Sequence, residues 1–244
     1  MSTLALHGKS ALVTGGARRI GRAIALQLAH AGADITITFR KSAADAHETV
    51  RQIEALGRRA QALACDVRSE DSVRAAVAAT AAFHGKIEIL VNNAAVFESV
   101  PLDRITLQQW DEVFETNARG PFLVAREAMP HLRATHGTIV NIGSLGGLRA
   151  WPGHGHYCAS KAAVHMLTEV MAKAFAPEVS VNCVAPGWID QGDSDASTSA
   201  RFATKTPAQR NGTAADVAEA VLFFAANPGF VTGQVLAVDG GLGL

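Results

Sequence analysis

Two side chains four residues apart could carry acid–base chemistry. Tyr157 is the only tyrosine in the chain, and Lys161 follows it in the sequence YCASK. In a helix, residues i and i+4 lie on one face. A tyrosine with its ordinary pKa of about 10 is a poor acid–base catalyst at neutral pH, but a neighbouring ammonium group stabilises its phenolate. The pair therefore predicts a proton-transfer site, and Ser144, upstream at the end of a strand-like segment, could orient a substrate oxygen.

A glycine-rich segment near the N-terminus indicates a nucleotide site. The strand-like run 10–15 leads into TGGARRIG (14–21), and a helical pattern follows in which Ile20, Ile24 and Leu28 recur every four residues. Glycines allow a tight turn, and they let backbone N–H groups approach a pyrophosphate that the helix N-terminus also favours. A turn between the first strand and the first helix is the context that a dinucleotide-binding motif requires.

The end of the second predicted strand (33–39) bears on the choice of cofactor. An NAD site usually places an acid there for the adenosine ribose hydroxyls. This chain instead has Phe39-Arg40-Lys41-Ser42. Arg40 and Arg18 could form a cationic clamp for a 2′-phosphate, although both could also be solvated arginines at a strand end and a helix start. The missing acid favours NADP(H).

These residues need a parallel sheet to bring them together. Apolar, β-branched runs alternate with alanine-rich helical segments, which predicts βαβ units, a doubly wound α/β sheet and a ligand site at the carboxyl ends of the strands. Residues 1–244 show no internal linker and are predicted to form one domain. The stretch 190–212 is polar and weakly periodic, and we expect it to form a substrate lid, with a long surface loop as the alternative. The seven predicted strands are 10–15, 33–39, 60–67, 87–94, 137–144, 179–187 and 233–241.

Composition narrows the class of protein. The 244 residues are 48% hydrophobic and 18% charged with zero net charge, so we expect a sizeable core and no nucleic-acid partner. Cys65, Cys158 and Cys183 are scattered, and neither a signal-peptide pattern nor a membrane-spanning run is present, which predicts a cytoplasmic protein without membrane attachment. His154 and His156 lack a third ligand at metal-binding spacing, so no metal site is expected.

Taken together, these motifs resemble the short-chain dehydrogenase/reductase family over essentially the whole chain. The resemblance adds Asp66 in CDV as the acid at the adenine pocket, Asn92-Asn93-Ala94 beside the central strand, and the terminal TGQVLAVDGG. It implies a single-domain Rossmann fold with a seven-stranded parallel sheet and helices on both faces. The implied cofactor-binding residues are Gly15, Arg18, Arg19, Ile20, Gly21, Arg40, Asp66, Val67, Asn93, Ala94, Lys161, Pro186 and Gly187.

The resemblance also implies a mechanism and an assembly. NADPH would deliver a hydride to a carbonyl or imine carbon of a small molecule while Tyr157 supplies the proton. Lys161 would bind the nicotinamide ribose and lower the tyrosine pKa, Ser144 would hold the substrate, and Asn117 would maintain a water-linked proton path. Family members are usually tetramers, and the apolar segment 162–175 suits such an interface, so we expect a homotetramer.

Some positions depart from the family pattern. Arg19 replaces a glycine of the turn, and RRIG, FRKSAADA, NNAAVF and AQRNGTAADV are similar to the pteridine reductase branch, in which the positions of Arg19 and Phe97 contact the pterin. That branch, however, carries an aspartate where this chain has Ser144. Phe97 could equally be a loop hydrophobe, and Trp151 could line the substrate pocket or only anchor its loop. Dihydropterin reduction, 3-oxoacyl-thioester reduction, general carbonyl reduction and a non-catalytic NADP(H) sensor therefore remain open.

Overall fold

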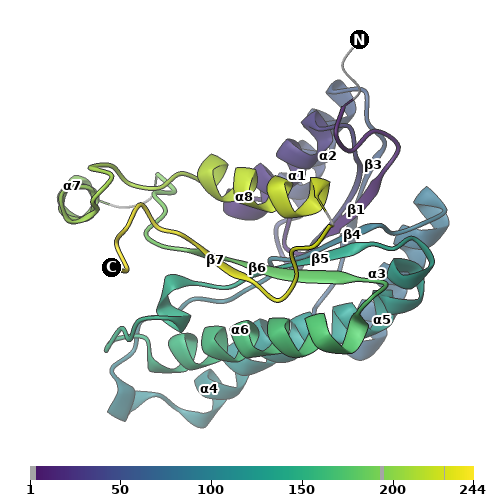
Figure 1. Ribbon diagram of the computed structural model, residues 1–244. Helices are drawn as coiled ribbons and strands as arrows, with labels where there is room; N and C mark the ends of the chain where they lie inside the picture. Colours follow the sequence, from purple (N-terminus) through teal and green to yellow (C-terminus); the bar gives the residue numbers. More distant parts are fainter. Residues whose placement is uncertain (1–3, 193–194, 228) are drawn as a thin grey trace.

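The computed structural model describes residues 4–192, 195–227 and 229–244. Their strands form one sheet of seven parallel strands in the order β3-β2-β1-β4-β5-β6-β7 (Figure 1), which confirms the predicted fold. The strands are β1 (Ser10–Val13), β2 (Asp34–Phe39), β3 (Ala60–Ala64), β4 (Ile89–Asn92), β5 (Thr138–Ile142), β6 (Ser180–Pro186) and β7 (Val235–Val238).

Helices cover both faces of the sheet (Figure 1). One layer holds α1 (Arg19–His30), α2 (Ala43–Ala55) and α8 (Ala214–Ala226). The opposite layer holds α3 (Glu70–His84), α4 (Leu107–Phe114), α5 (Gly120–Ala134) and α6 (Gly155–Phe175). Among the described helices, none combines the length and apolar character needed to cross a bilayer. The short helices are η1 (Leu102–Arg104), η2 (Glu115–Arg119) and η3 (Leu145–Gly147).

The central strands are buried because both faces of the sheet are covered. Every residue of β1, β4 and β5 is buried, as expected for parallel strands between two helical layers. The order of the strands reverses between β1 and β4, since β1 pairs with β2 on one side and β4 on the other. In doubly wound sheets, ligands bind at this reversal, beyond the carboxyl ends of the strands.

The segment 190–212 differs from a plain surface loop. It contains the ten-residue helix α7 (Ala196–Lys205), and Asp195 caps the start of this helix. The Asp195 side chain accepts a hydrogen bond from the Thr198 N–H at 2.9 Å. Such a cap satisfies one of the unpaired N–H groups at a helix start. No residue of α7 is buried, and the helix lies at one side of the molecule, beyond the strand ends (Figure 1). That this segment acts as a lid remains a prediction.

Candidate active site

Tyr157 and Lys161 lie side by side on α6, as their spacing predicts. The Lys161 ammonium nitrogen is 5.8 Å from the centre of the Tyr157 ring. The lysine side chain is only 3% exposed, and its Nζ donates a hydrogen bond to the Ile142 carbonyl at 2.7 Å. Burial lowers the pKa of Lys161 to about 8, because the charged form is poorly solvated there. The residue is therefore a buried cation at neutral pH.

The environment of Tyr157 differs from the one that the resemblance implies. Burial raises the pKa of the phenol above its ordinary value, and a hydrogen bond with Ser144 partly opposes that rise. Lys161 was expected to lower this pKa, but its ammonium group is directed to the Ile142 carbonyl. A phenol with a raised pKa stays protonated at neutral pH, which is the form that a proton donor needs.

Asn117 is fully buried in η2, a single π-helical turn between α4 and α5. Its Oδ1 accepts a hydrogen bond from the Val96 N–H at 2.8 Å, while its Nδ2 donates to the Val96 carbonyl at 3.0 Å and to the Ser160 hydroxyl at 3.1 Å. Its amide thus ties the segment after β4 to α6, next to Tyr157. The proton path implied for Asn117 remains a prediction.

His165, which sequence reasoning did not single out, lies behind Ser144. The Ser144 N–H donates to His165 Nε2 at 3.4 Å, and a methyl group added at Gly143 would collide with the imidazole. Burial, with a contribution from the Lys161 charge, lowers the pKa of His165 to about 4. The imidazole is therefore neutral and can accept the hydrogen bond. Its position on the inner face of α6 resembles that of an ordinary core residue.

The glycine-rich turn and the end of β2 border a cavity of about 390 Å³. A side chain at Gly21 would collide with the Gly15 carbonyl, so α1 begins tightly against the turn. Lys161, Pro186 and Gly187 line a second cavity instead. The predicted cofactor residues that line the first cavity are Gly15, Arg18, Arg19, Ile20, Gly21, Arg40, Asp66, Val67, Asn93 and Ala94.

Arg19 keeps the backbone conformation of the glycine that it replaces. Its φ of 55° lies in the left-handed region, which costs a residue with a side chain about 1–2 kcal/mol. Its side chain lines both cavities, so the position is occupied by a cation where the two cavities meet. The Gly15 backbone is left-handed as well, with a φ of 64°.

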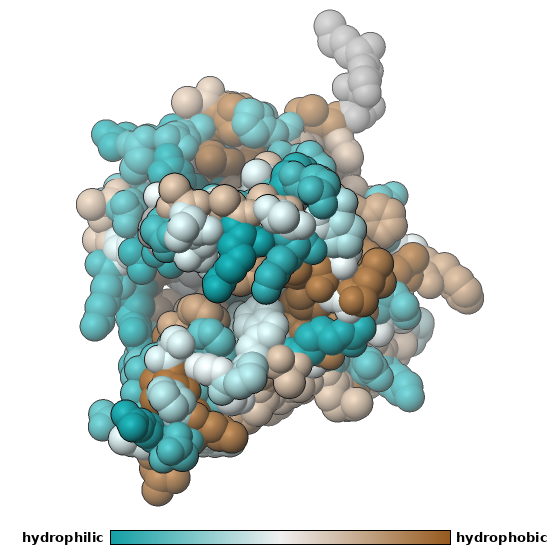
Figure 2. Space-filling model, turned by 90° about the vertical axis from the view of Figure 1, so that its left-hand side faces the viewer, coloured by the Kyte–Doolittle hydropathy of each residue, from teal (hydrophilic) through white to brown (hydrophobic). Residues whose placement is uncertain are grey.

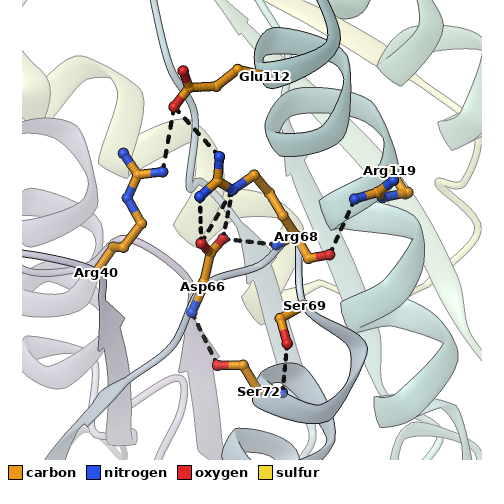
Figure 3. A network of polar contacts seen from close by, with 7 residues as sticks. All are labelled: Arg40, Asp66, Arg68, Ser69, Ser72, Glu112 and Arg119. Carbon is orange, nitrogen blue, oxygen red and sulfur yellow. Dashed lines mark hydrogen bonds and ion pairs between the residues drawn. The ribbon is translucent and has the colours of Figure 1, made fainter. Parts of the chain in front are cut away.

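A network of charges crosses the part of the first cavity that Arg40 and Asp66 line (Figure 3). Arg68 holds the Asp66 carboxylate at 2.6 Å, and that contact lowers the pKa of Asp66. Glu112, on α4, lies 3.5 Å from Arg68 and 3.6 Å from Arg40. Arg40 therefore lines the cavity as predicted but faces a carboxylate from a distant helix. Sequence reasoning missed Arg68 and Glu112, because only the fold brings α4 next to the loop after β3.

Aromatic side chains dominate the second cavity, which has a volume of about 610 Å³. Phe97 meets Tyr157 edge-on, with ring centres 4.8 Å apart, and Trp151 lies nearly parallel to Tyr157 at 6.4 Å. The predicted substrate residues Phe97, Trp151 and Arg19 all line this cavity. Sequence reasoning missed Trp188 and Phe202, which stack at 3.9 Å and join the strand end of β6 to α7.

The two cavities meet at shared residues. Arg19, Phe97 and Tyr157 line both of them, so a nucleotide in the first cavity would present its nicotinamide end to the second. Figure 2 looks onto this side of the molecule, where hydrophilic and hydrophobic side chains gather around a hollow. Ser144 and Lys161 line only the second cavity, together with Pro186 and Gly187. The arrangement suits transfer between a bound nucleotide and a small molecule beside Tyr157.

The histidines before Tyr157 contact Glu98. His154 Nδ1 is 3.0 Å from the Glu98 carbonyl oxygen, and the buried His156 has its Nε2 3.6 Å from the Glu98 carboxylate. Within the described residues, no three His, Cys, Asp or Glu side chains are grouped so that they could hold a metal ion.

Comparison with known proteins agrees with this geometry. Residues 15–243 match the family model described as enoyl-(acyl carrier protein) reductase. A 3-oxoacyl-(acyl-carrier-protein) reductase from Staphylococcus aureus is 37% identical over 240 residues, which cover 96% of this chain and 98% of that protein. The chain belongs to the short-chain dehydrogenase/reductase family.

Solved structures of short-chain dehydrogenase/reductases have the same fold. A short-chain dehydrogenase from Burkholderia cenocepacia J2315, in complex with NADP, is 39% identical and superimposes with a TM-score of 0.93 over 98% of this chain and 100% of that one. A blue fluorescent protein from a metagenomic library, in complex with NADPH, is 36% identical, with a TM-score of 0.91 over 98% and 99% of the two chains.

Proposed function

We propose that this chain is an NADPH-dependent reductase that acts on a carbonyl group, or a C=N group, of a small molecule. One observation carries the proposal: the Tyr157 phenol lies beside a buried ammonium group at the junction of the two cavities. The non-catalytic NADP(H) sensor is the weaker alternative, because a sensor needs no phenol and ammonium pair beside a second cavity.

NADP(H) is the proposed cofactor. Arg18 and Arg40 line the end of the first cavity where the β2 strand offers no acid, and a 2′-phosphate there would bind these guanidinium groups, competing with Glu112 for Arg40. The complexes of the two solved relatives with NADP and NADPH support the choice. The glycine-rich turn also fits a nucleotide. Side chains at Gly15 and Gly21 would crowd neighbouring atoms, so backbone forms this part of the cavity floor.

In this mechanism the bound NADPH supplies the hydride, and the protein handles position and the proton. Ser144 holds the substrate oxygen near the Tyr157 hydroxyl, which donates its proton to that oxygen as the hydride reaches carbon. Lys161, buried beside Tyr157, would hold the ribose hydroxyls of the nucleotide. Asn117 keeps η2 fixed against α6, so that a path for the returning proton stays open.

The finer substrate assignment is a proposal of the same kind. Phe97, Trp151 and Arg19 are proposed as substrate contacts, since all three line the second cavity. The sequence relationship to the Staphylococcus aureus reductase favours a 3-oxoacyl thioester as second candidate. The exposed Phe97 beside Arg19 favours a flat heterocycle such as a dihydropterin. The segment 190–212, with α7, is proposed to close over whichever substrate binds.

The protein is also proposed to form a homotetramer. The edge strand β7 exposes Leu236, and the α5–α6 side exposes Phe122, Met166 and Val170, which gives two separate apolar surfaces. Two distinct self-complementary surfaces are what a tetramer with twofold axes requires. Light scattering at micromolar concentration tests this proposal, and a monomer there would overturn it.

A cytoplasmic location is proposed from the chemistry of the cysteines. Cys65, Cys158 and Cys183 are all unpaired, and two of them are buried. Free thiols of this kind persist where the surroundings are reducing. Fractionation of the cells that make the protein, followed by immunodetection, tests the assignment.

The deciding experiment follows the loss of NADPH absorbance with a panel holding a simple aromatic ketone, a 3-oxoacyl thioester and a dihydropterin. Tyr157→Phe is the matched control, because it removes only the hydroxyl. We expect turnover of at least one compound with NADPH, reduced about 100-fold or more in the variant, while NADPH still binds. Equal turnover by Tyr157→Phe would refute the proton-donor role, and NADPH binding without turnover of any compound would favour the sensor.

A further inference from the structure

The second cavity combines flat walls with positive charge, and this combination bears on the substrate. The following inference rests on the proposed reductase function. We propose that the substrate is a flat aromatic carbonyl compound that carries a negative charge at the end away from the carbonyl. The carbonyl lies at Tyr157, the ring lies against Phe97, and the charge is met by Arg149 and Lys205.

The aromatic walls of the cavity leave a ring face uncovered. Phe97 stacks one face on His154, with ring centres 4.6 Å apart and planes 22° from parallel. It is nevertheless 59% exposed, although it lines both cavities. An exposed phenyl face in a cavity gains most from another flat ring, since stacking adds to the burial of apolar area. A flexible acyl chain would gain only the burial.

The farther wall is a rigid aromatic pair. Trp188 and Phe202 stack with planes only 5° from parallel and belong to the end of β6 and to α7. Both line the second cavity. Together with Phe97 and Trp151 they give the cavity flat surfaces on separate segments, which suits a planar ligand. Since α7 has no buried residue, this stack is also a main contact that places Lys205.

The charged side chains that line the same cavity are all cationic. Arg149 and Lys205 line it, and none of its described lining residues is an aspartate or a glutamate. Arg149 is fixed in place, because its Nε donates to the Gly243 carbonyl at 2.7 Å and its Nη1 to the Leu148 carbonyl at 3.2 Å. In the described part of the chain, neither cation forms an ion pair. The other two cations that line the cavity are Arg19, at its junction with the first cavity, and the buried Lys161.

The burial of the residues that line the cavity predicts how the substrate is oriented in it. Ser144 and Lys161 are buried, whereas Arg149 and Lys205 are exposed, on the loop after η3 and at the end of α7. A carbonyl at Tyr157 therefore points inward, and an acidic group on the opposite side of the ring points toward the two cations. A carboxylate accepts charge-assisted hydrogen bonds from both side chains, and the arginine can bind it through two N–H groups.

The test compares three compounds in NADPH oxidation. They are 6-acetyl-2-naphthoate, its uncharged methyl ester, and the aliphatic keto acid 7-oxooctanoate. The proposal predicts the highest kcat/KM for the naphthoate, with the advantage over the ester expressed in KM. A 3-oxoacyl thioester, free and on its acidic carrier protein, forms a further arm because that carrier would also be drawn to the two cations.

Variants then assign the charge preference. Arg149→Gln and Lys205→Gln should each lower the ratio of the kcat/KM for the naphthoate to that for the methyl ester about fivefold, the effect of a partly exposed ion pair. The ratio of the two kcat/KM values is measured within one variant, so damage to the fold or to α7 that affects both substrates equally cancels. Lys173→Gln, an exposed lysine on α6 that lines neither cavity, should leave the ratio unchanged, and Lys205→Arg should restore it.

Each other result has a definite meaning. Equal kcat/KM for the naphthoate and its ester, or an equal ratio in all variants, would overturn the anionic assignment while the reductase function stands. Preference for 7-oxooctanoate would overturn the aromatic assignment. A far higher kcat/KM for the carrier-bound thioester would identify the carrier as the source of the negative charge and overturn the proposal. Absence of turnover with every compound would refute the reductase function itself.

Discussion

Replacing Lys161 with methionine should make the protein more stable while it removes activity. Lys161 is 3% exposed, and the pKa of its ammonium group falls from 10.5 to about 8 on folding. At about 1.4 kcal/mol per pKa unit, burying this charge costs about 3 kcal/mol at pH 7. Methionine fills a similar volume without a charge. The lost hydrogen bond to Ile142 offsets about 1–2 kcal/mol, which leaves a net gain of about 1–2 kcal/mol in the free energy of unfolding.

The pH dependence of the stability difference distinguishes a charge effect from a packing effect, because a change in packing alone would not vary with pH. The folded pKa of Lys161 is lower than the unfolded one, so between pH 8 and 10.5 the unfolded chain binds a proton that the folded chain does not. The wild type therefore gains stability relative to Lys161→Met as the pH rises through that window. The cost of burial falls to about 1 kcal/mol at pH 10. The difference between the two proteins should thus change by about 2 kcal/mol between pH 7 and pH 10.

The assay is denaturant unfolding of both proteins, without cofactor, at several pH values. Groups whose pKa does not depend on Lys161, such as Cys65, whose pKa is raised by burial, cancel because both proteins contain them. At pH 7 we also expect a thermal midpoint higher by about 5 °C in Lys161→Met. Lys173→Met is the control at an exposed site and should change neither quantity. A variant that is less stable at pH 7, or a difference that stays constant to pH 10, would refute the argument from burial.

Three further predictions concern the cofactor, the turn and the support of Ser144. Arg40→Ser should raise the Kd of NADPH about tenfold, since one charge-assisted contact is lost, and should leave the Kd of NADH unchanged in the same titration. Arg19→Gly should be more stable than Arg19→Val by about 2 kcal/mol in urea unfolding, because both lose the guanidinium group but only glycine tolerates the φ of 55°. His165→Leu should lower kcat about tenfold with an unchanged Kd for NADPH, because the buried Ser144 N–H loses its acceptor. His165→Gln should recover part of that loss, and equal kcat in both variants would contradict a positioning role.

The local sequence pattern was sufficient to predict the sheet and the alternation of strands and helices along the chain. Alternation of buried strands with helical segments predicted seven parallel strands, and the structure has seven. The i, i+4 spacing placed Tyr157 and Lys161 together, because a helix fixes that geometry without help from other segments. The glycine-rich turn was likewise a local feature, bounded by the strand and helix that its motif requires.

What the sequence did not reveal depends on contacts between distant segments. Glu112 reaches Arg40 and Arg68 only because the fold places α4 beside the ends of β2 and β3. Trp188 meets Phe202 only because α7 folds back over the end of β6. The polar composition of 190–212 gave no indication of α7. Asp195 caps this short helix, but no residue of the helix is buried, so no apolar periodicity marks it in the sequence. The raised pKa of Tyr157 was also out of reach, since it depends on burial rather than on the neighbouring residue type.

Three features that disfavour stability occur at the junction of the two cavities or in the second cavity beside it. Lys161 is a buried charge, Arg19 has a left-handed backbone, and Phe97 exposes a phenyl ring. Each of them could be relieved by a single substitution, and a site with no role would gain stability from all three changes. Unfavourable local choices persist where they serve a task, so their concentration around one junction is itself evidence that hydride and proton transfer take place there. The same reasoning predicts that stabilising substitutions at these three positions will each reduce turnover, and they will do so without disturbing the fold.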